Sequence, residues 1–171
     1  VKNETEKTAD FSLFNCFIFN KAGTMGQVAE WDEATGTAYR SGFPYYVYYD
    51  EYESALKKKD ICFLTADNKP TAYETNLQRF LGTDNPFSIP VSVKNGRLAC
   101  GRSDYGSTCG ALQFDFTLEA GEEKEINLLA GVAKDIADVN ALKNEYLNVK
   151  KQLDDVKKLW DERISSFTVE T

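Results

Sequence analysis

The stretch ALQFDFTL, residues 111–118, alternates apolar and polar side chains from Leu112 to Leu118. Alternation with a period of two is typical of a β-strand that buries one face and exposes the other to water. A turn-forming segment, residues 119–122, follows it, and EINLLAG, residues 125–131, then returns as a second apolar run. We therefore expect these two segments to pair as antiparallel neighbours with one solvated face.

Further strand-like segments precede this pair. They lie at residues 11–20, 27–31, 45–49 and 60–65, and an Asn-Gly turn at residues 94–97 predicts a hairpin with a strand on each side. Apolar residues in 11–20 and 60–65 occupy both faces, which is typical of strands buried on both sides. The pattern of residues 71–80 fits a short helix or turn. Because no long helices are interleaved with the strands, the sequence predicts a mainly β fold, an antiparallel β-sandwich.

A long C-terminal α-helix is expected after the strands, from Asp135 to Ile164, with Asp135 or Asp138 as its N-cap. Its apolar residues recur every three or four positions and form one seam: Val139, Leu142, Tyr146, Val149, Leu153, Val156 and Trp160. Such a rod would be about 45 Å long, more than one face of a small sandwich requires. We predict that the sandwich, residues 1–134, covers only part of the seam. Residues 135–171 are then a linker helix and the start of the next segment.

Composition restricts the possible partners and chemistry. The net charge is −7, and the only basic run, residues 57–59, is short, so we expect no nucleic-acid-binding surface. The chain contains no histidine, which removes the commonest general base and the usual ligand of zinc sites. With no signal peptide and no apolar run of membrane-spanning length, we expect a cytoplasmic protein without membrane contact.

The four cysteines show no metal-binding spacing. Cys16 and Cys62 lie in apolar runs, where a free thiol packs as a small hydrophobic group. Cys100 and Cys109 bracket a loop that contains glycine, and two alternatives stay open for them: an ordinary hairpin with free thiols, or a disulfide.

Acidic and aromatic residues are the candidates for a functional site in this sequence. No two carboxylates have a spacing that enforces a shared site, so we interpret the acidic residues as solvated loop residues. Trp31 and Tyr105 lie near polar loops, where each could either stack on a sugar ring or pack in the core. For the tyrosines of residues 45–49, core packing is the favoured interpretation. No cofactor-binding or metal-binding motif is present.

Several short motifs follow one another along the whole chain. They are Val1-Lys2-Asn3-x-Thr5, the aromatic strand Phe11 to Phe19, Arg79-Phe80-Leu81-Gly82, Gly110-Ala111-Leu112-Gln113, Leu118-Glu119-Ala120-Gly121-Glu122, Leu128-Leu129-Ala130-Gly131 and Leu159-Trp160. In their order and spacing the chain resembles glycoside hydrolase family 94, the cellobiose-type phosphorylases once called glycosyltransferase family 36.

The resemblance implies a β-supersandwich similar to galactose mutarotase, here without its first strands, then linker helices and an α/α-barrel catalytic domain. Family members cleave a β-glucoside with inorganic phosphate and invert the anomeric centre. The resemblance places the general acid and the phosphate in the barrel, outside this chain. It therefore implies that this chain holds no catalytic residue, cofactor or metal, and that the complete enzyme forms a homodimer.

The resemblance also suggests where substrate could approach this domain. Residues 40–49 are similar to an Arg- and Tyr-containing segment of cellobiose phosphorylases, which makes Arg40 and Tyr45 candidates for the active-site rim. Trp31 and Tyr105 complete our set of rim candidates. The segment departs from the family pattern by carrying glycine, proline and a single arginine.

Three functions were weighed. The first is a non-catalytic supersandwich domain of a glycoside phosphorylase, with scaffold, dimerisation and active-site-rim roles. The second is a free-standing carbohydrate-binding module. The third, a mutarotase-like epimerase, is disfavoured because such an enzyme would be expected to use histidine and the chain has none.

Overall fold

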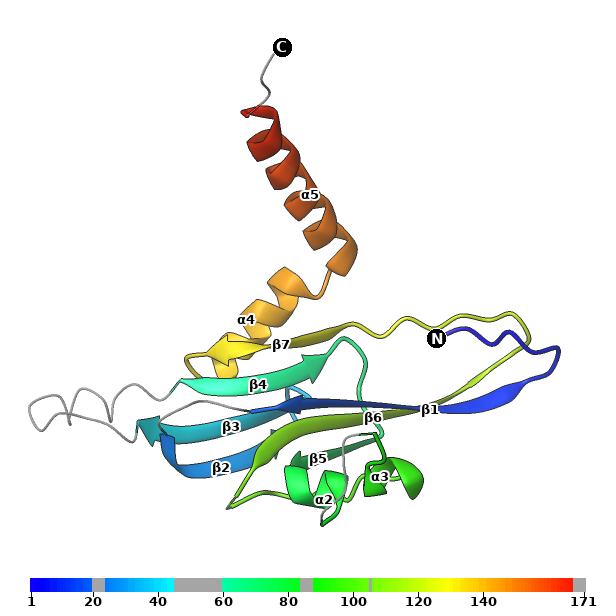
Figure 1. Ribbon diagram of the computed structural model, residues 1–171, viewed down its shortest axis with the longest axis vertical. Helices are drawn as coiled ribbons and strands as arrows, with labels where there is room; N and C mark the ends of the chain where they lie inside the picture. Colours follow the sequence, from blue (N-terminus) through cyan, green and yellow to red (C-terminus); the bar gives the residue numbers. More distant parts are fainter. Residues whose placement is uncertain (20–23, 45–59, 84–87, 105, 168–171) are drawn as a thin grey trace, which may run out of the picture.

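The computed structural model describes residues 1–19, 24–44, 60–83, 88–104 and 106–167, and its strands form two antiparallel sheets (Figure 1). The strands are β1 (Ala9–Ile18), β2 (Thr24–Asp32), β3 (Thr37–Pro44), β4 (Ile61–Ala66), β5 (Ala72–Asn76), β6 (Thr108–Leu118) and β7 (Leu128–Ala133). The predicted antiparallel sandwich is confirmed. The predicted strand at residues 27–31 lies within β2, whereas residues 45–49 lie outside the described residues.

One sheet has the strand order β1-β6-β5, and the other has the order β2-β3-β4-β7. In the first, β6 pairs with β1 along its whole length, with Ala9 opposite Leu118 and Ile18 opposite Cys109. In the second, β7 pairs with β4. The predicted pairing of residues 111–118 with 125–131 is therefore wrong, because the chain crosses between the sheets after β6. Alternation identifies the buried face of a strand but not its neighbour.

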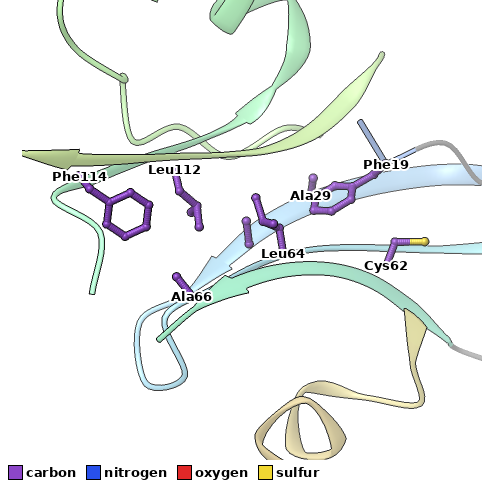
Figure 2. Packing of buried hydrophobic residues seen from close by; sticks show 8 residues of the cluster. Phe19, Ala29, Cys62, Leu64, Ala66, Leu112 and Phe114 are labelled. Atoms are coloured by element: carbon purple, nitrogen blue, oxygen red, sulfur yellow. The ribbon is translucent and has the colours of Figure 1, made fainter. Parts of the chain in front are cut away.

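The main core lies between the two sheets, where side chains from their inner faces meet (Figure 2). Its buried members are Phe19, Ala29, Ala38, Cys62, Leu64, Ala66, Leu112 and Phe114. Gly110 on β6 leaves room for neighbouring core side chains, since a Cβ at this position would lie 2.7 Å from the Phe19 ring and 2.9 Å from Cβ of Leu64 in the facing sheet. Glycine is therefore required at position 110, because any larger residue would clash with these core side chains.

The two strands expected to be buried on both faces differ. Every residue of β4 is buried, as predicted, because the core covers one face and a cluster with Val139 covers the other. No residue of β1 is fully buried, and Phe17 and Ile18 are 42% and 41% exposed. The expectation for residues 11–20 is met only in part: Leu13 packs against the main core, and Phe14 and Cys16 pack against a second cluster on the other face. These side chains stay partly exposed because β1 is the edge strand of its sheet.

Two short helices, α2 (Leu77–Leu81) and α3 (Val91–Lys94), lie beside β5 and β6 (Figure 1). Phe80 of α2 packs with Cys109 and Ala111 of β6 in a second buried cluster. The prediction of a helix or turn at residues 71–80 is correct only for α2, because β5 occupies the first half of that segment. The five residues of β5 are too few for their alternating pattern to identify a strand from the sequence alone.

The Asn-Gly turn at residues 94–97 does not form a hairpin. Asn95 caps the C-terminus of α3, and Gly96 follows with φ of +68°, a conformation that favours glycine. The segment then meets Gln113 of β6, whose amide donates to the Gly96 carbonyl (3.1 Å) and accepts from the Leu98 N–H (2.9 Å). Gln113, expected on a solvated face, is therefore buried by α3 and the segment after it.

Two helices, α4 (Ile136–Tyr146) and α5 (Val149–Ser165), replace the predicted continuous rod. Asp135 is the N-cap of α4, as one of the two expected caps, and accepts a hydrogen bond from the Asp138 N–H at 2.9 Å. The rod prediction is wrong because Asn148 interrupts it and starts α5 by accepting from the Lys151 N–H at 3.2 Å.

The sandwich covers the apolar seam only at α4. Val139 is fully buried and Leu142 packs beside it against β4 and β7. In contrast, α5 has no buried residue and extends away from the sheets (Figure 1). Its large apolar side chains are between 43% and 65% exposed: Val149, Leu153, Val156, Leu159, Trp160 and Ile164. The prediction of a partly covered seam is confirmed.

All four cysteines are free. Cys109 is buried in the cluster beneath α2, whereas Cys100 is exposed, so the disulfide alternative for this pair is not formed. Cys62 is buried in the main core and Cys16 is partly buried, in agreement with their expected packing role.

Candidate functional site

Of the four predicted rim residues, Tyr45 and Tyr105 lie outside the described residues. Trp31 lies on β2 and Arg40 on β3, where they pair with Ala38 and Ala29, respectively. Both alanines belong to the core between the sheets. Since directly paired residues share a face, Trp31 and Arg40 lie on the inner side of their sheet.

Trp31 connects the two sheets at one edge of the sandwich. Its ring stacks on Tyr73 of β5, with centroids 4.6 Å apart and planes at 11°. Its Nε1 donates to Oε2 of Glu33 at 2.8 Å, and Glu33 also pairs with Lys69. The hydrogen bond from Lys69 and, to a smaller extent, the one from Trp31 lower the pKa of the Glu33 carboxyl. Tyr73 thus occupies one face of the ring that a sugar would need for stacking.

Arg40 is only 3% exposed and lies beside Cys62 of β4. Burial lowers the pKa of the Arg40 guanidinium, and the neighbouring Cys62 opposes this effect. Within the described residues, the side chain is therefore part of the core. Its contact with substrate stays a prediction.

Residues 99–104 close the sandwich edge next to Trp31. Ser103 and Ala29 of β2 exchange two backbone hydrogen bonds of 2.8 and 2.9 Å. On the other side, the Cys100 N–H donates to the carbonyl of Tyr73 in β5 at 2.8 Å. The segment thus joins the edge strands of the two sheets.

An ion pair between a buried carboxylate and a partly exposed arginine holds this segment in place. Glu74 of β5 has no exposed side-chain area and receives hydrogen bonds from Nε (3.1 Å) and Nη2 (2.8 Å) of Arg79 in α2. Nη2 also donates to the carbonyl of Arg102 at 2.6 Å, and the guanidinium packs directly against Gly101. The hydrogen bonds that Arg79 donates to Glu74 raise the pKa of Arg79 above its usual value. The pair fixes the backbone from which the Arg102 side chain reaches β2.

We call Glu30, Tyr39, Arg102 and Asp104 the Arg102 cluster. Arg102 contacts Oε1 of Glu30 through Nη1 (2.8 Å) and Oδ1 of Asp104 through Nε (2.7 Å). The Tyr39 hydroxyl donates to Oε2 of Glu30 at 3.1 Å. Burial first, and then Glu30, raise the pKa of Tyr39, so the hydroxyl stays protonated at neutral pH.

In the sequence, Asp104 of the Arg102 cluster directly precedes Tyr105, one of the predicted rim residues. Sequence reasoning missed Glu30 and Arg102, because they come from different elements that the fold brings together and carry no local motif. Arg102 bridges both carboxylates, so neither is available as an unpaired general acid or base. The Arg102 cluster can form hydrogen bonds with hydroxyl groups of a ligand. It contains no unpaired carboxylate that could act as the acid or base in bond cleavage.

The described residues contain no group of three or more histidine, cysteine, aspartate or glutamate side chains that could hold a metal ion. Within that same part of the chain, no helix is both long and apolar enough to cross a bilayer.

Residues 1–149 match the family model described as "Glycosyl hydrolase 94, supersandwich domain". The chain belongs to this family. The supersandwich domain is 26% identical to 3-O-β-D-glucopyranosyl-β-D-glucuronide phosphorylase of Paenibacillus borealis, over 99% of this chain and 22% of that protein. It is 27% identical to N,N'-diacetylchitobiose phosphorylase of Vibrio proteolyticus, over 100% of the chain and 22% of the relative. Cellobionic acid phosphorylase of Neurospora crassa is 26% identical over 86% of the chain and 19% of its own length.

The family resemblance seen in the sequence is thus confirmed, and the supersandwich domain spans 22% of the length of each of the first two relatives. The structure gives two of the resembling motifs a physical role. Arg79 of residues 79–82 pairs with the buried Glu74. In residues 110–113, Gly110 admits the facing sheet and Gln113 binds the segment after α3.

Proposed function

We propose that the chain is the non-catalytic supersandwich domain of an inverting glycoside phosphorylase, which cleaves a β-glucoside or related oligosaccharide with inorganic phosphate. The observation that carries the proposal is the family match over residues 1–149, shared with relatives that are named phosphorylases. The described carboxylates support a non-catalytic role, since those of the Arg102 cluster are already paired. We call the complete enzyme the parent protein, and its co-substrate phosphate binds outside this domain.

The exposed apolar face of α5 supports a partner for this domain within the parent protein. A coiled coil with a second copy is a poor alternative, because α5 has 17 residues, little more than two heptads, and Lys150 and Lys157 flank the seam. A partner within the same chain does not need such a long helix, because the covalent link keeps the two surfaces at a high local concentration. We assign the α/α-barrel catalytic domain as the partner of α5.

The remaining roles extend this proposal. The parent protein is a homodimer in which Trp31, Arg40, Tyr45 and Tyr105 approach the substrate rim. Closure of the sandwich edge beside Trp31 supports this, because it orders the Arg102 cluster, whose member Asp104 directly precedes Tyr105 in the sequence. The parent protein acts in the cytoplasm, and the four free thiols suit a reducing compartment.

Charge substitution on α5 tests the proposal. Leu153→Glu changes the net charge by the same amount as Lys158→Gln on the opposite side of the helix. In the parent protein, Leu153→Glu should destabilise by about 2 kcal/mol and reduce phosphate-dependent cleavage, because it places a charge in a buried interface. Lys158→Gln should leave both unchanged.

In the 171-residue chain, neither variant should change the urea midpoint, because Leu153 is already 51% exposed. Equal stability of Leu153→Glu and wild type in the parent protein would remove the catalytic domain as the partner of α5.

A further inference from the structure

A second polar region, separate from the Arg102 cluster, lies where three parts of the fold converge. It is a hollow of about 200 Å³ between the β2–β3 turn, the loop after β4, and α4. Its charged lining residues are Glu33, Asp67, Lys69 and Lys143, and Ala34 and Ala66 add small apolar surfaces. This volume is below the roughly 300–1,000 Å³ of sites for drug-sized ligands, so the hollow suits a small molecule or one unit of a larger one.

Hydrogen bonds hold Asp67, in one wall of the hollow, in a fixed orientation. Asp67 accepts from the N–H (3.0 Å) and Nδ2 (2.9 Å) of Asn127 and from Nδ2 of Asn68 (2.8 Å). Burial acts to raise the pKa of Asp67, but these hydrogen bonds together lower it, so the group is ionised at neutral pH. A ligand would therefore meet side chains that are already ordered, which reduces the entropic cost of binding.

Opposite Asp67, the turn that forms the second wall is also fixed. Asp32 accepts hydrogen bonds from the N–H (2.7 Å) and hydroxyl (2.6 Å) of Thr35. Glu33 is held by Lys69 and by Nε1 of Trp31. The carboxylates of the hollow thus project from two preorganised loops.

Lys143 supplies the third wall. Its Nζ donates to the Thr35 carbonyl at 2.7 Å, which is its only hydrogen bond among the described residues. An ammonium group has three N–H donors, so two of them remain for a ligand or water. Burial lowers the pKa of Lys143, while the nearby Asp67 opposes this. A partly desolvated ammonium with unused donors favours a ligand that offers oxygen acceptors.

The mixture of charges defines the class of ligand. Asp67 and Glu33 repel anions, and Lys143 and Lys69 repel cations. A neutral polyol can bind both the carboxylates and the ammonium groups, because each hydroxyl can accept a hydrogen bond from an ammonium and donate one to a carboxylate. We propose that this hollow binds a single pyranose unit of an oligosaccharide. The choice of a sugar among neutral polyols rests on the proposed function.

The test is an NMR titration of the 171-residue chain with cellobiose, followed through backbone amides. Saturable shifts at Thr35, Asp67 and Lys143 with a millimolar dissociation constant are expected. Lys143→Met should raise that constant about tenfold, because it removes a charged donor but keeps the aliphatic stem. The matched control Lys134→Met, at an exposed position just before α4, should not change it.

An unchanged Val139 amide resonance would show that α4 remains docked in Lys143→Met. If α4 detaches, Glu33→Gln replaces that variant, since it removes charge without altering α4, and weaker cellobiose binding is again expected. Absence of saturable shifts, or equal binding by wild type and a docked variant, would overturn the proposal. Cleavage by the parent protein does not enter the titration, so a failure of the proposed function is observed separately.

Discussion

Removal of Arg79 should reveal how strongly the buried ion pair stabilises the sandwich edge. In Arg79→Met, the carboxylate of Glu74, which has no exposed side-chain area, loses its one charged partner among the residues that the structure describes. Breaking a buried pair costs about 3–5 kcal/mol. Two backbone N–H groups still donate to Oε1 of Glu74, at 2.9 and 2.8 Å, and the Arg79 side chain is 44% exposed, which admits water. We therefore expect a loss of about 2–3 kcal/mol.

Urea unfolding of the 171-residue chain measures this loss. With a slope of about 2 kcal/mol per molar urea, the midpoint should fall by about 1–1.5 M. Arg102→Met is the control, because its two ion pairs are exposed and should cost less than about 1 kcal/mol. Adding Glu74→Gln to Arg79→Met should restore part of the loss by removing the unpaired charge. Equal midpoints for Arg79→Met and Arg102→Met would refute the reasoning.

Three further predictions concern packing, helix capping and pH. Gly110→Ala should cost about 1–3 kcal/mol because its Cβ would overlap the facing sheet, whereas Gly131→Ala meets only ordinary contacts and should be nearly neutral in the same urea assay. Asn148→Ala should reduce the helical circular dichroism signal of α5 by removing a cap worth about 1 kcal/mol; an unchanged signal would contradict the role of Asn148. Because the pKa of Asp67 is lowered, its contribution is present above the unfolded pKa of about 3.9 and is lost as pH falls through the folded-state pKa. The stability difference between wild type and Asp67→Asn should therefore shrink as pH falls, and a constant difference would count against it.

The sequence predicted those parts of the fold that depend on one strand at a time. The apolar run at residues 61–64 identified β4, because a strand covered on both sides has no polar face. The alternation at residues 111–118 identified the buried face of β6. It could not reveal that β1 and β5 are its neighbours, since the same pattern fits any partner.

Local signals failed where a different structure used the same residues. The Asn-Gly pair at residues 95–96 ends a helix here, because a positive φ is needed after a helix as well as in a hairpin. The spacing of the apolar seam is the same on both sides of Asn148. It therefore did not show that one helix ends before this residue and that Asn148 caps the next one.

The candidate site was predictable only in part. Aromatic residues near loops suggested Trp31, but its stacking on Tyr73 requires knowledge of which strands face each other. The register places Arg40 on the inner face of the sheet, which the sequence did not indicate, and its contact with substrate stays a prediction. Arg102 had no sequence signal, because its position depends on a contact between its carbonyl and Arg79, which lies 23 residues earlier and is itself paired with Glu74.

The most direct test of the proposed function compares phosphorolysis by two proteins. The parent protein and the 171-residue chain are each incubated with inorganic phosphate and a panel of β-linked disaccharides, and the sugar phosphate released is quantified. We predict sugar phosphate from the parent protein and none from the chain alone. Sugar phosphate produced by the chain alone, or none from the parent protein with any substrate of the panel, would contradict the assignment of a non-catalytic phosphorylase domain.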